Sequence, residues 1–186
     1  NTIFRLNNLL FCYAFFSENN ISNKIISDKY KFLKPVDGRG LTHHIFIKKK
    51  RIIMIDESYN ANPDTMLQSI EYFDSIKKDS SKKILILGNM NELGVNTDKL
   101  HFKLIKNIDK FNFKFVILCG EFLRRSIKKS IKQKNEFIYL DSKNEIMRFL
   151  YKNIHNDDII MVKCSNNTEV NNFAVNLLKK KVKSFD

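Results

Sequence analysis

The chain has 186 residues, 43% of them hydrophobic and 12% aromatic, which excludes a disordered segment and suffices for one well-packed domain with part of another. Its three cysteines are far apart in the sequence and form no CxxC pair and no cluster with His. This pattern argues against a zinc site or a disulfide framework and is consistent with a reducing compartment. The net charge of +13 admits a nucleic acid or an anionic ligand as partner, although the lysines are spread along the chain.

The first part of the chain predicts two helices and then a boundary. Residues 2–16 are strongly apolar and are expected to form a buried helix, and residues 22–32 to form a short second one. The segment from Pro35 to Gly40 marks a turn, so we expect a domain boundary between residues 1–37 and 38–186. No apolar run is long enough to span a bilayer, and because Asn1 is not Met we expect an internal fragment.

From residue 45 onward, apolar strands alternate with amphipathic helices. Strands are predicted at residues 45–47, 52–55, 84–87, 115–118, 137–140 and 159–162, and helices at residues 63–77, 98–110, 122–133, 143–153 and 168–182. The first two strands face each other across Lys48 to Arg51 as a hairpin, and the rest of the pattern favours a mostly parallel sheet with helices on both faces. Asn62, Thr97 and Ser142 are candidate N-caps.

Polar side chains follow three of the predicted strands at the point where each strand ends. The three segments are Ile55-Asp-Glu-Ser-Tyr-Asn-Ala-Asn-Pro-Asp64, Gly88-Asn-Met-Asn-Glu-Leu-Gly94 and Lys163-Cys-Ser-Asn-Asn167. In an open α/β sheet, ligands bind beyond the carboxyl ends of the strands. These segments therefore predict one binding crevice built from three loops.

Each loop also has a purely structural interpretation. Asn62 and Pro63 are a cap and a first helical residue, although capping leaves the stretch from Asp56 to Asn60 unexplained. Glu92 and His101 are either a contact that pins the second loop or a catalytic pair. In the third loop, Lys163 and Ser165 either bind an anion at a helix N-terminus or only cap the helix.

The first two of these polar segments, residues 55–64 and 88–94, are followed by His101. Together they closely resemble the C-terminal domain of the Mur ligases, and among these the MurF type. Gly38-Arg39 and Val162-Lys163-Cys-Ser165 are similar to two further motifs of that family, and the resemblance runs from about Leu6 to Lys180. It implies an ATP-dependent ligase that adds D-alanyl-D-alanine to UDP-N-acetylmuramoyl-tripeptide in peptidoglycan precursor synthesis, through an acyl phosphate. It also implies ATP and Mg²⁺ as cofactors, a monomer, and the bacterial cytoplasm.

Mur ligases have three domains, and their central domain carries a phosphate-binding loop. The chain has no GxxxxGK[ST] run. We therefore expect residues 1–37 to be the helical end of the central domain and residues 38–186 to be the third domain, a Rossmann-like, mostly parallel six-stranded sheet. By itself the chain is not expected to catalyse the ligation, and we assign it no catalytic residue and no metal ligand.

The resemblance assigns the binding residues one by one. On the ATP side it implies Asn7 at the adenine, Arg39 at the phosphates and ribose, and Glu57 at the ribose hydroxyls. On the dipeptide side it implies a larger set, namely Tyr59, Asn60, Asn62, Asn89, Glu92, Lys163 and Ser165. The chain departs from the family pattern at three positions, with Ile3 in place of a His, Asn89 in place of an acidic residue and Cys164 in place of a Gly. At position 164 a side chain is expected to force a different backbone conformation.

Two other functions stay open at this stage. The first is another Mur or folylpolyglutamate-type amide ligase, in which the Ser-Tyr-Asn-Ala-Asn-Pro string is not expected. The second is a basic α/β module that binds nucleic acid, which requires Lys and Arg on one face with aromatic rings available for stacking.

Overall fold

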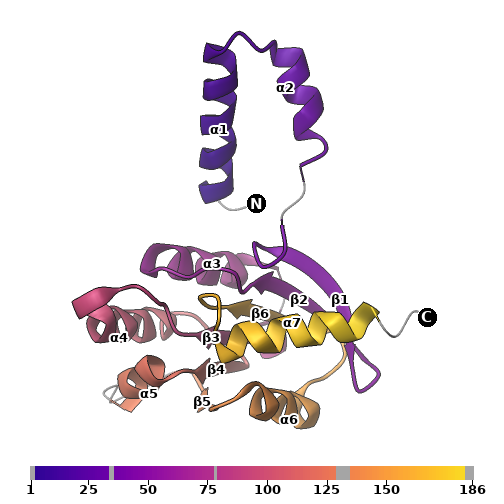
Figure 1. Ribbon diagram of the computed structural model, residues 1–186. Helices are drawn as coiled ribbons and strands as arrows, with labels where there is room; N and C mark the ends of the chain where they lie inside the picture. Colours follow the sequence, from indigo (N-terminus) through magenta and orange to yellow (C-terminus); the bar gives the residue numbers. More distant parts are fainter. Residues whose placement is uncertain (1–2, 34–35, 78, 129–134, 183–186) are drawn as a thin grey trace. The chain divides into compact units, whose positions relative to one another are not determined.

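The computed structural model describes residues 3–33, 36–77, 79–128 and 135–182, which fall into two compact units, Asn1–Pro35 and Val36–Asp186 (Figure 1). The first unit holds helices α1 (Ile3–Glu18) and α2 (Asn23–Tyr30), tied together where Tyr30 Oη donates to the carbonyl of Leu9 at 2.6 Å. The expected helix is present, but its predicted burial is wrong, since Leu10 and Phe11 are 56% and 74% exposed. The eight-residue α2 is too short to cover a 16-residue apolar helix.

The second unit alternates strands with helices, as predicted. Its strands are β1 (Leu41–Ile47), β2 (Lys50–Glu57), β3 (Lys83–Gly88), β4 (Phe115–Cys119), β5 (Phe137–Tyr139) and β6 (Ile159–Lys163). Its helices are α3 (Pro63–Ser75), α4 (Thr97–Ile108), α5 (Glu121–Lys128), α6 (Lys143–Asn153) and α7 (Glu169–Val182), with short 3₁₀ turns η1 (Ser80–Lys82) and η2 (Gly94–Asn96).

The strands form one six-stranded sheet in the order β1-β2-β6-β3-β4-β5. Only the β1–β2 hairpin is antiparallel, so the prediction of a mostly parallel six-stranded sheet is confirmed. The last strand in the chain, β6, lies between β2 and β3. This insertion brings the loops after β2, β3 and β6 together at the carboxyl edge of the sheet.

Helices cover both faces of the sheet, as expected. On one face α6 and α7 pack on Ile84 and Ile86 of β3, and on the other face α3, α4 and α5 pack on Leu85 and Leu87 of the same strand. Successive strand residues point to opposite faces, and all six residues of this central strand are buried. The second unit therefore has two apolar cores separated by its sheet.

Some predicted boundaries differ from the structure. Asn62 and Ser142 cap α3 and α6 as expected, whereas Thr97 is the first residue of α4 and uses its hydroxyl to bond the carbonyl of Gly94 at 2.6 Å. Strand β1 begins four residues before the predicted Ile45, because Leu41 already pairs with Asp56 of β2. The helix predicted at residues 122–133 is α5 as far as Lys128, and residues 129–133 lie outside the described part.

Candidate functional site

A buried carboxylate organises the end of β2. Asp56 is 3% exposed and accepts hydrogen bonds from the Gly38 N–H (3.1 Å), the Ser58 N–H (3.1 Å) and the Ser58 hydroxyl (2.6 Å). Its main-chain carbonyl accepts a further bond from the Gly40 N–H at 2.6 Å. Because a buried charge is tolerated only when donors surround it, this network fixes the Gly38–Gly40 segment against the loop that follows β2.

The same segment places Arg39 beside Tyr59. The Tyr59 N–H donates to the carbonyl of Gly38 at 3.1 Å, and the Arg39 guanidinium lies 4.3 Å from the centre of the Tyr59 ring. Gly38 has a φ of +70°, and a Cβ there would come within 2.8 Å of the Tyr59 Cβ. Only glycine fits that close approach, so Gly38 is what allows Arg39 and Tyr59 to stand together at the exposed rim.

Lys163 and Glu57 form an ion pair across neighbouring strands. They are register partners on β6 and β2, and Lys163 Nζ lies 3.5 Å from Glu57 Oε2 and donates to the Asn60 carbonyl at 3.2 Å. Lys163 is only 2% exposed, and burial lowers its pKa while Glu57 opposes that shift. The structure therefore places Lys163 directly against the Glu57 carboxylate.

Ser165 joins the three loops. Its N–H donates to the Asn89 carbonyl at 3.1 Å, its hydroxyl accepts from the Asn91 N–H at 2.9 Å, and the same hydroxyl donates to the Ala61 carbonyl at 3.3 Å. The side chain is 5% exposed. Ser165 thus holds the loops after β2, β3 and β6 in one arrangement.

His101 pins the loop after β3. Its Nε2 accepts from the Met90 N–H at 3.0 Å and its Nδ1 lies 2.7 Å from the Thr97 carbonyl, so the ring is neutral with the proton on Nδ1. Burial lowers the pKa of His101, which is 0% exposed. Both ring nitrogens bond main-chain atoms, so the loop-pinning interpretation is correct, but its partner is Met90 and the expected pairing with Glu92 is wrong.

Asn89 presents an unsatisfied acceptor at the same edge. Its Oδ1 is buried and has no hydrogen-bond partner among the described residues. The side chain amide occupies the space beside Gly120, where any Cβ would collide with it. Gly120 has a φ of +129°, which also favours glycine. A buried carbonyl oxygen without a donor fits a ligand that brings an N–H group.

Four other predicted residues have different surroundings. Asn62 forms a capping box with Thr65, in which its side chain accepts from the Thr65 N–H at 2.9 Å. This residue is therefore the helix cap that its purely structural interpretation predicted. Asn60 is exposed and bonds the N–H of Ala61, while Glu92 is exposed in a left-handed turn with a φ of 63°. Asn7 belongs to α1 in the first unit.

The cysteines near this edge are not reactive groups. Burial raises the pKa of Cys119 and of Cys164 to about 12, so both thiols stay protonated at neutral pH. Cys164 donates to the Ser58 carbonyl at 3.5 Å, and its φ is negative, so no left-handed backbone accompanies this departure from glycine. Its Cβ instead fills the space beside Gly88, where a second Cβ would lie 2.6 Å away.

Sequence reasoning gave no role to Asp56, although this residue bonds Gly38, Gly40 and Ser58. The signal was an acidic residue directly after four apolar residues, which is an unusual place for a charge without partners. Within the described residues, no group of three or more His, Cys, Asp or Glu could hold a metal ion. In the same part of the chain, no helix combines the length and apolarity that crossing a membrane requires.

Comparisons with known proteins show which family the chain resembles. A family model described as "Mur ligase, glutamate ligase domain" matches residues 45–166. The UDP-N-acetylmuramoyl-tripeptide–D-alanyl-D-alanine ligase of Rickettsia prowazekii (strain Madrid E) is 30% identical over 138 residues, which cover 73% of this chain and 27% of that protein. The enzyme of the same name from Bacillus subtilis (strain 168) is 23% identical over 155 residues, or 82% of this chain and 34% of that protein. The chain thus spans about a third of the length of these relatives, or less.

Solved structures show the same fold. A crystal structure of MurF from Acinetobacter baumannii superposes with a TM-score of 0.76 at 16% identity, covering 96% of this chain and 38% of that one. The MurF ligase of Thermotoga maritima in complex with ADP gives a TM-score of 0.61 at 22% identity, covering 83% and 33%. At these identities the likeness establishes the architecture.

Proposed function

The chain belongs to the Mur ligase family, and from that premise we propose that it is the C-terminal part of an ATP-dependent, MurF-type ligase that joins D-alanyl-D-alanine to UDP-N-acetylmuramoyl-tripeptide. In this proposal residues 1–37 end the central domain, residues 38–186 form the third domain, and the enzyme works as a monomer in peptidoglycan precursor synthesis in the bacterial cytoplasm. The observation that carries it is the meeting of three loops at Ser165 on one sheet edge. This edge holds the ion-paired Glu57, the Arg39 guanidinium over the Tyr59 ring and the unsatisfied Asn89 Oδ1.

The loop after β2 is assigned to the nucleotide. The Glu57 carboxylate suits two ribose hydroxyls, because its oxygens accept hydrogen bonds. The ion pair with Lys163, which also bonds the Asn60 carbonyl, holds this carboxylate in place. The Arg39 guanidinium suits phosphate oxygens, because its fixed fork of donors matches them. Tyr59 then orients Arg39 through the contact of its ring with the guanidinium. Asn7 remains assigned to the adenine.

The loop after β3 is assigned to the incoming dipeptide. The unsatisfied Asn89 Oδ1 is suited to an N–H of the dipeptide, and exposed Glu92 and Asn60 are suited to its outer part. Ser165 and Asn62 are assigned to holding the loops, since their side chains already bond protein atoms. Lys163 and Tyr59 move from the dipeptide side to the nucleotide side, because the Lys163 ammonium contacts Glu57 and the Tyr59 ring contacts Arg39.

In this proposal, the sheet edge contributes to catalysis by positioning the nucleotide and the amine. ATP supplies the phosphoryl group that turns the peptide carboxylate into an acyl phosphate, and this chain holds nucleotide and amine where the two meet. The described residues offer no cluster for Mg²⁺, so we derive no step through the metal. A segment around residues 36–40, anchored by Asp56, is the proposed hinge.

A domain graft tests this function. Residues 36–186 would replace the corresponding part of the Bacillus subtilis relative, and ADP release that depends on D-alanyl-D-alanine and UDP-N-acetylmuramoyl-tripeptide would be measured. We expect the graft to ligate and Glu57→Ala to abolish most of that activity, while Glu71→Ala on the exposed face of α3 leaves it unchanged. A folded graft that ligates glutamate instead would support the folylpolyglutamate-type alternative. Salt-sensitive binding of single-stranded nucleic acid by an inactive graft would support the nucleic-acid module.

A further inference from the structure

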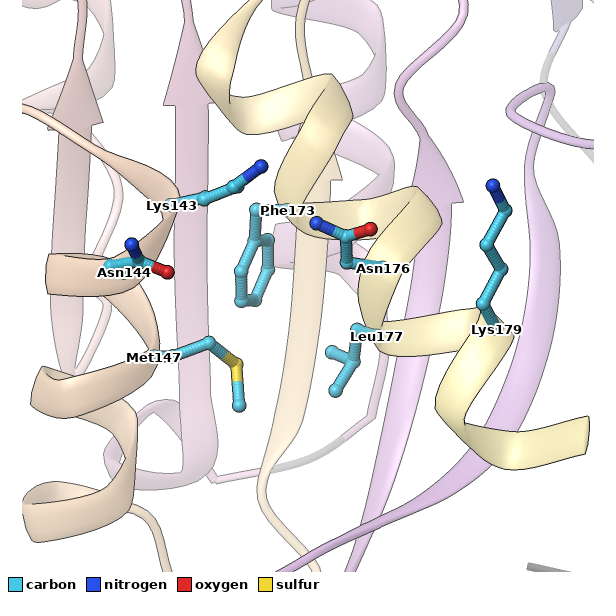
Figure 2. Close-up of a pocket in the computed structure, with 7 residues that line it drawn as sticks. All are labelled: Lys143, Asn144, Met147, Phe173, Asn176, Leu177 and Lys179. Atoms are coloured by element: carbon cyan, nitrogen blue, oxygen red, sulfur yellow. The ribbon is translucent and has the colours of Figure 1, made fainter. Parts of the chain in front are cut away.

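A groove lies between α6 and α7, on a helical layer that the proposed active edge does not use. Figure 2 shows Lys143, Asn144 and Met147 of α6 on one side of it, with Phe173 and Asn176 of α7 opposite. The cavity has a volume of about 300 Å³. That size is at the lower end of the range for small-molecule sites, roughly 300–1,000 Å³, and is too small for a folded partner.

The floor of the groove is apolar and rigid. Phe173 is 1% exposed and Leu177 is 5% exposed, and both belong to the core on this face of the sheet, with Met147 packed against them. Because these side chains are held by the core, the floor is present before any ligand arrives. An aliphatic group gains free energy by covering Met147, the half-buried apolar side chain of the lining.

The rim of the groove is cationic and polar. Lys143 is half-buried at the first turn of α6 and Lys179 is exposed near the other end, and no ion pair among the described residues includes either ammonium. The nearby acid Glu169 is already engaged, since it accepts from the Lys143 N–H at 3.1 Å and from the Asn172 amide at 3.4 Å. The amides of Asn144 and Asn176 add neutral donors and acceptors between the two cations.

We propose that this groove binds a small amphipathic anion, whose apolar body covers the half-buried Met147 and whose acidic group lies at Lys143. A second copy of the chain is a poor occupant, because both surfaces would carry lysines on a chain of net charge +13. A nucleic acid base is a poor occupant because the Phe173 ring is too buried to stack on it. A neutral apolar ligand would remove water from Lys143 without offering it a partner.

Binding of octanoate to the chain tests the proposal, with 1-octanol as a neutral ligand of similar shape and acetate as an anion without an apolar body. Backbone amide shifts are the readout, so the site is mapped together with the affinity. We expect octanoate to bind saturably and to shift residues 143–147 and 173–179, and the two controls to bind at least about tenfold more weakly, the size of one charge-assisted hydrogen bond. Octyl phosphate in place of octanoate shows whether phosphate or carboxylate is preferred.

Matched variants separate charge from shape. Lys143→Gln should weaken octanoate about tenfold and leave octanol unchanged, whereas Lys152→Gln, an exposed change on the same helix outside the cavity, should alter neither. Equal affinity for octanol and octanoate, equal effects of the two lysine changes, or shifts gathered at the carboxyl edge would each overturn the proposal. The site shares no residue with the proposed nucleotide and dipeptide contacts, so its failure leaves the ligase function untouched.

Discussion

The loop after β2 and the loop after β3 lie at the same edge of the sheet, but their polar groups are used differently. Where β2 meets its loop, the Asp56 carboxylate accepts from Gly38 and Ser58, and Glu57 pairs with Lys163. The loop after β3 is held at Met90 by His101 and leaves the Asn89 Oδ1 without a partner. A network satisfied from within sets a fixed shape, whereas a buried acceptor without a donor is open to a ligand.

In the proposed function, this difference suits the two loops to two different substrates. A nucleotide that delivers its phosphoryl group to the right atom needs a rigid frame, which Asp56 and Lys163 supply from the protein side. In the same proposal, an incoming dipeptide needs an acceptor that no protein donor has already taken, which the Asn89 Oδ1 offers. The following changes break or sharpen the contrast, from the largest expected effect to the smallest.

Asp56→Ala is expected to have the largest effect on the stability of the chain. It leaves the Gly38 N–H, the Ser58 N–H and the Ser58 hydroxyl without their acceptor, which should lower the free energy of unfolding by about 3 kcal/mol. Urea unfolding measures it, with the exposed Glu71→Ala as control, expected within about 0.5 kcal/mol of the parent. A loss no greater than that of the control would show that the loop after β2 is not held by this network.

Lys163→Met sharpens the contrast by removing one partner of a buried pair. Glu57 loses its ion pair and the Asn60 carbonyl its donor, so we expect a loss of about 2 kcal/mol in unfolding free energy and weaker binding of ADP. Lys83→Met is the matched control, because Lys83 is another buried lysine that bonds a main-chain carbonyl, here of Asp74, away from the proposed nucleotide contacts. If both variants bind ADP as the parent does, Lys163 has no part in placing Glu57.

The loop after β3 should respond to pH through His101. Because burial holds the folded-state pKa of His101 below its ordinary value of 6.5, the unfolded chain takes up the proton first as the pH falls. Stability from this residue is therefore present above pH 6.5 and is lost below it, by up to about 1.4 kcal/mol per pH unit. Unfolding measured at several pH values for the parent and for His101→Gln checks this. An unchanged slope in the variant would assign the pH dependence to another group.

The sheet and its helices were predictable because the strands are short apolar runs between polar turns. The central strand β3 is buried along its whole length, so its residues 84–87 stand out in the sequence. The spacing of strands does not reveal that β6 inserts between β2 and β3, and this order is what makes Lys163 the neighbour of Glu57. For that reason the sequence alone could not place Lys163 on the nucleotide side.

Two further features depended on contacts that no local pattern contains. Asp56 bonds Gly38, 18 residues earlier, because the β1–β2 register brings Leu41 opposite Asp56. The apolar character of residues 2–16 correctly predicted a helix, but burial depends on what covers a helix, and α2 covers too little of it. Secondary structure and the β1–β2 hairpin therefore followed from the sequence, while the position of β6 and the exposure of α1 did not.

The most direct test of the nucleotide assignment is the map of backbone amide shifts when the chain is titrated with ADP. We expect saturable shifts gathered at residues 38–40, 57–60 and 163–165, weakened by Arg39→Ala and by Glu57→Gln. Arg51→Ala is the matched control, since this exposed arginine of β2 bonds Asp157 at the opposite edge of the sheet, and ADP binding should be unchanged by it. Shifts gathered elsewhere, or an affinity that falls equally in all three variants, would contradict the assignment of this edge to the nucleotide.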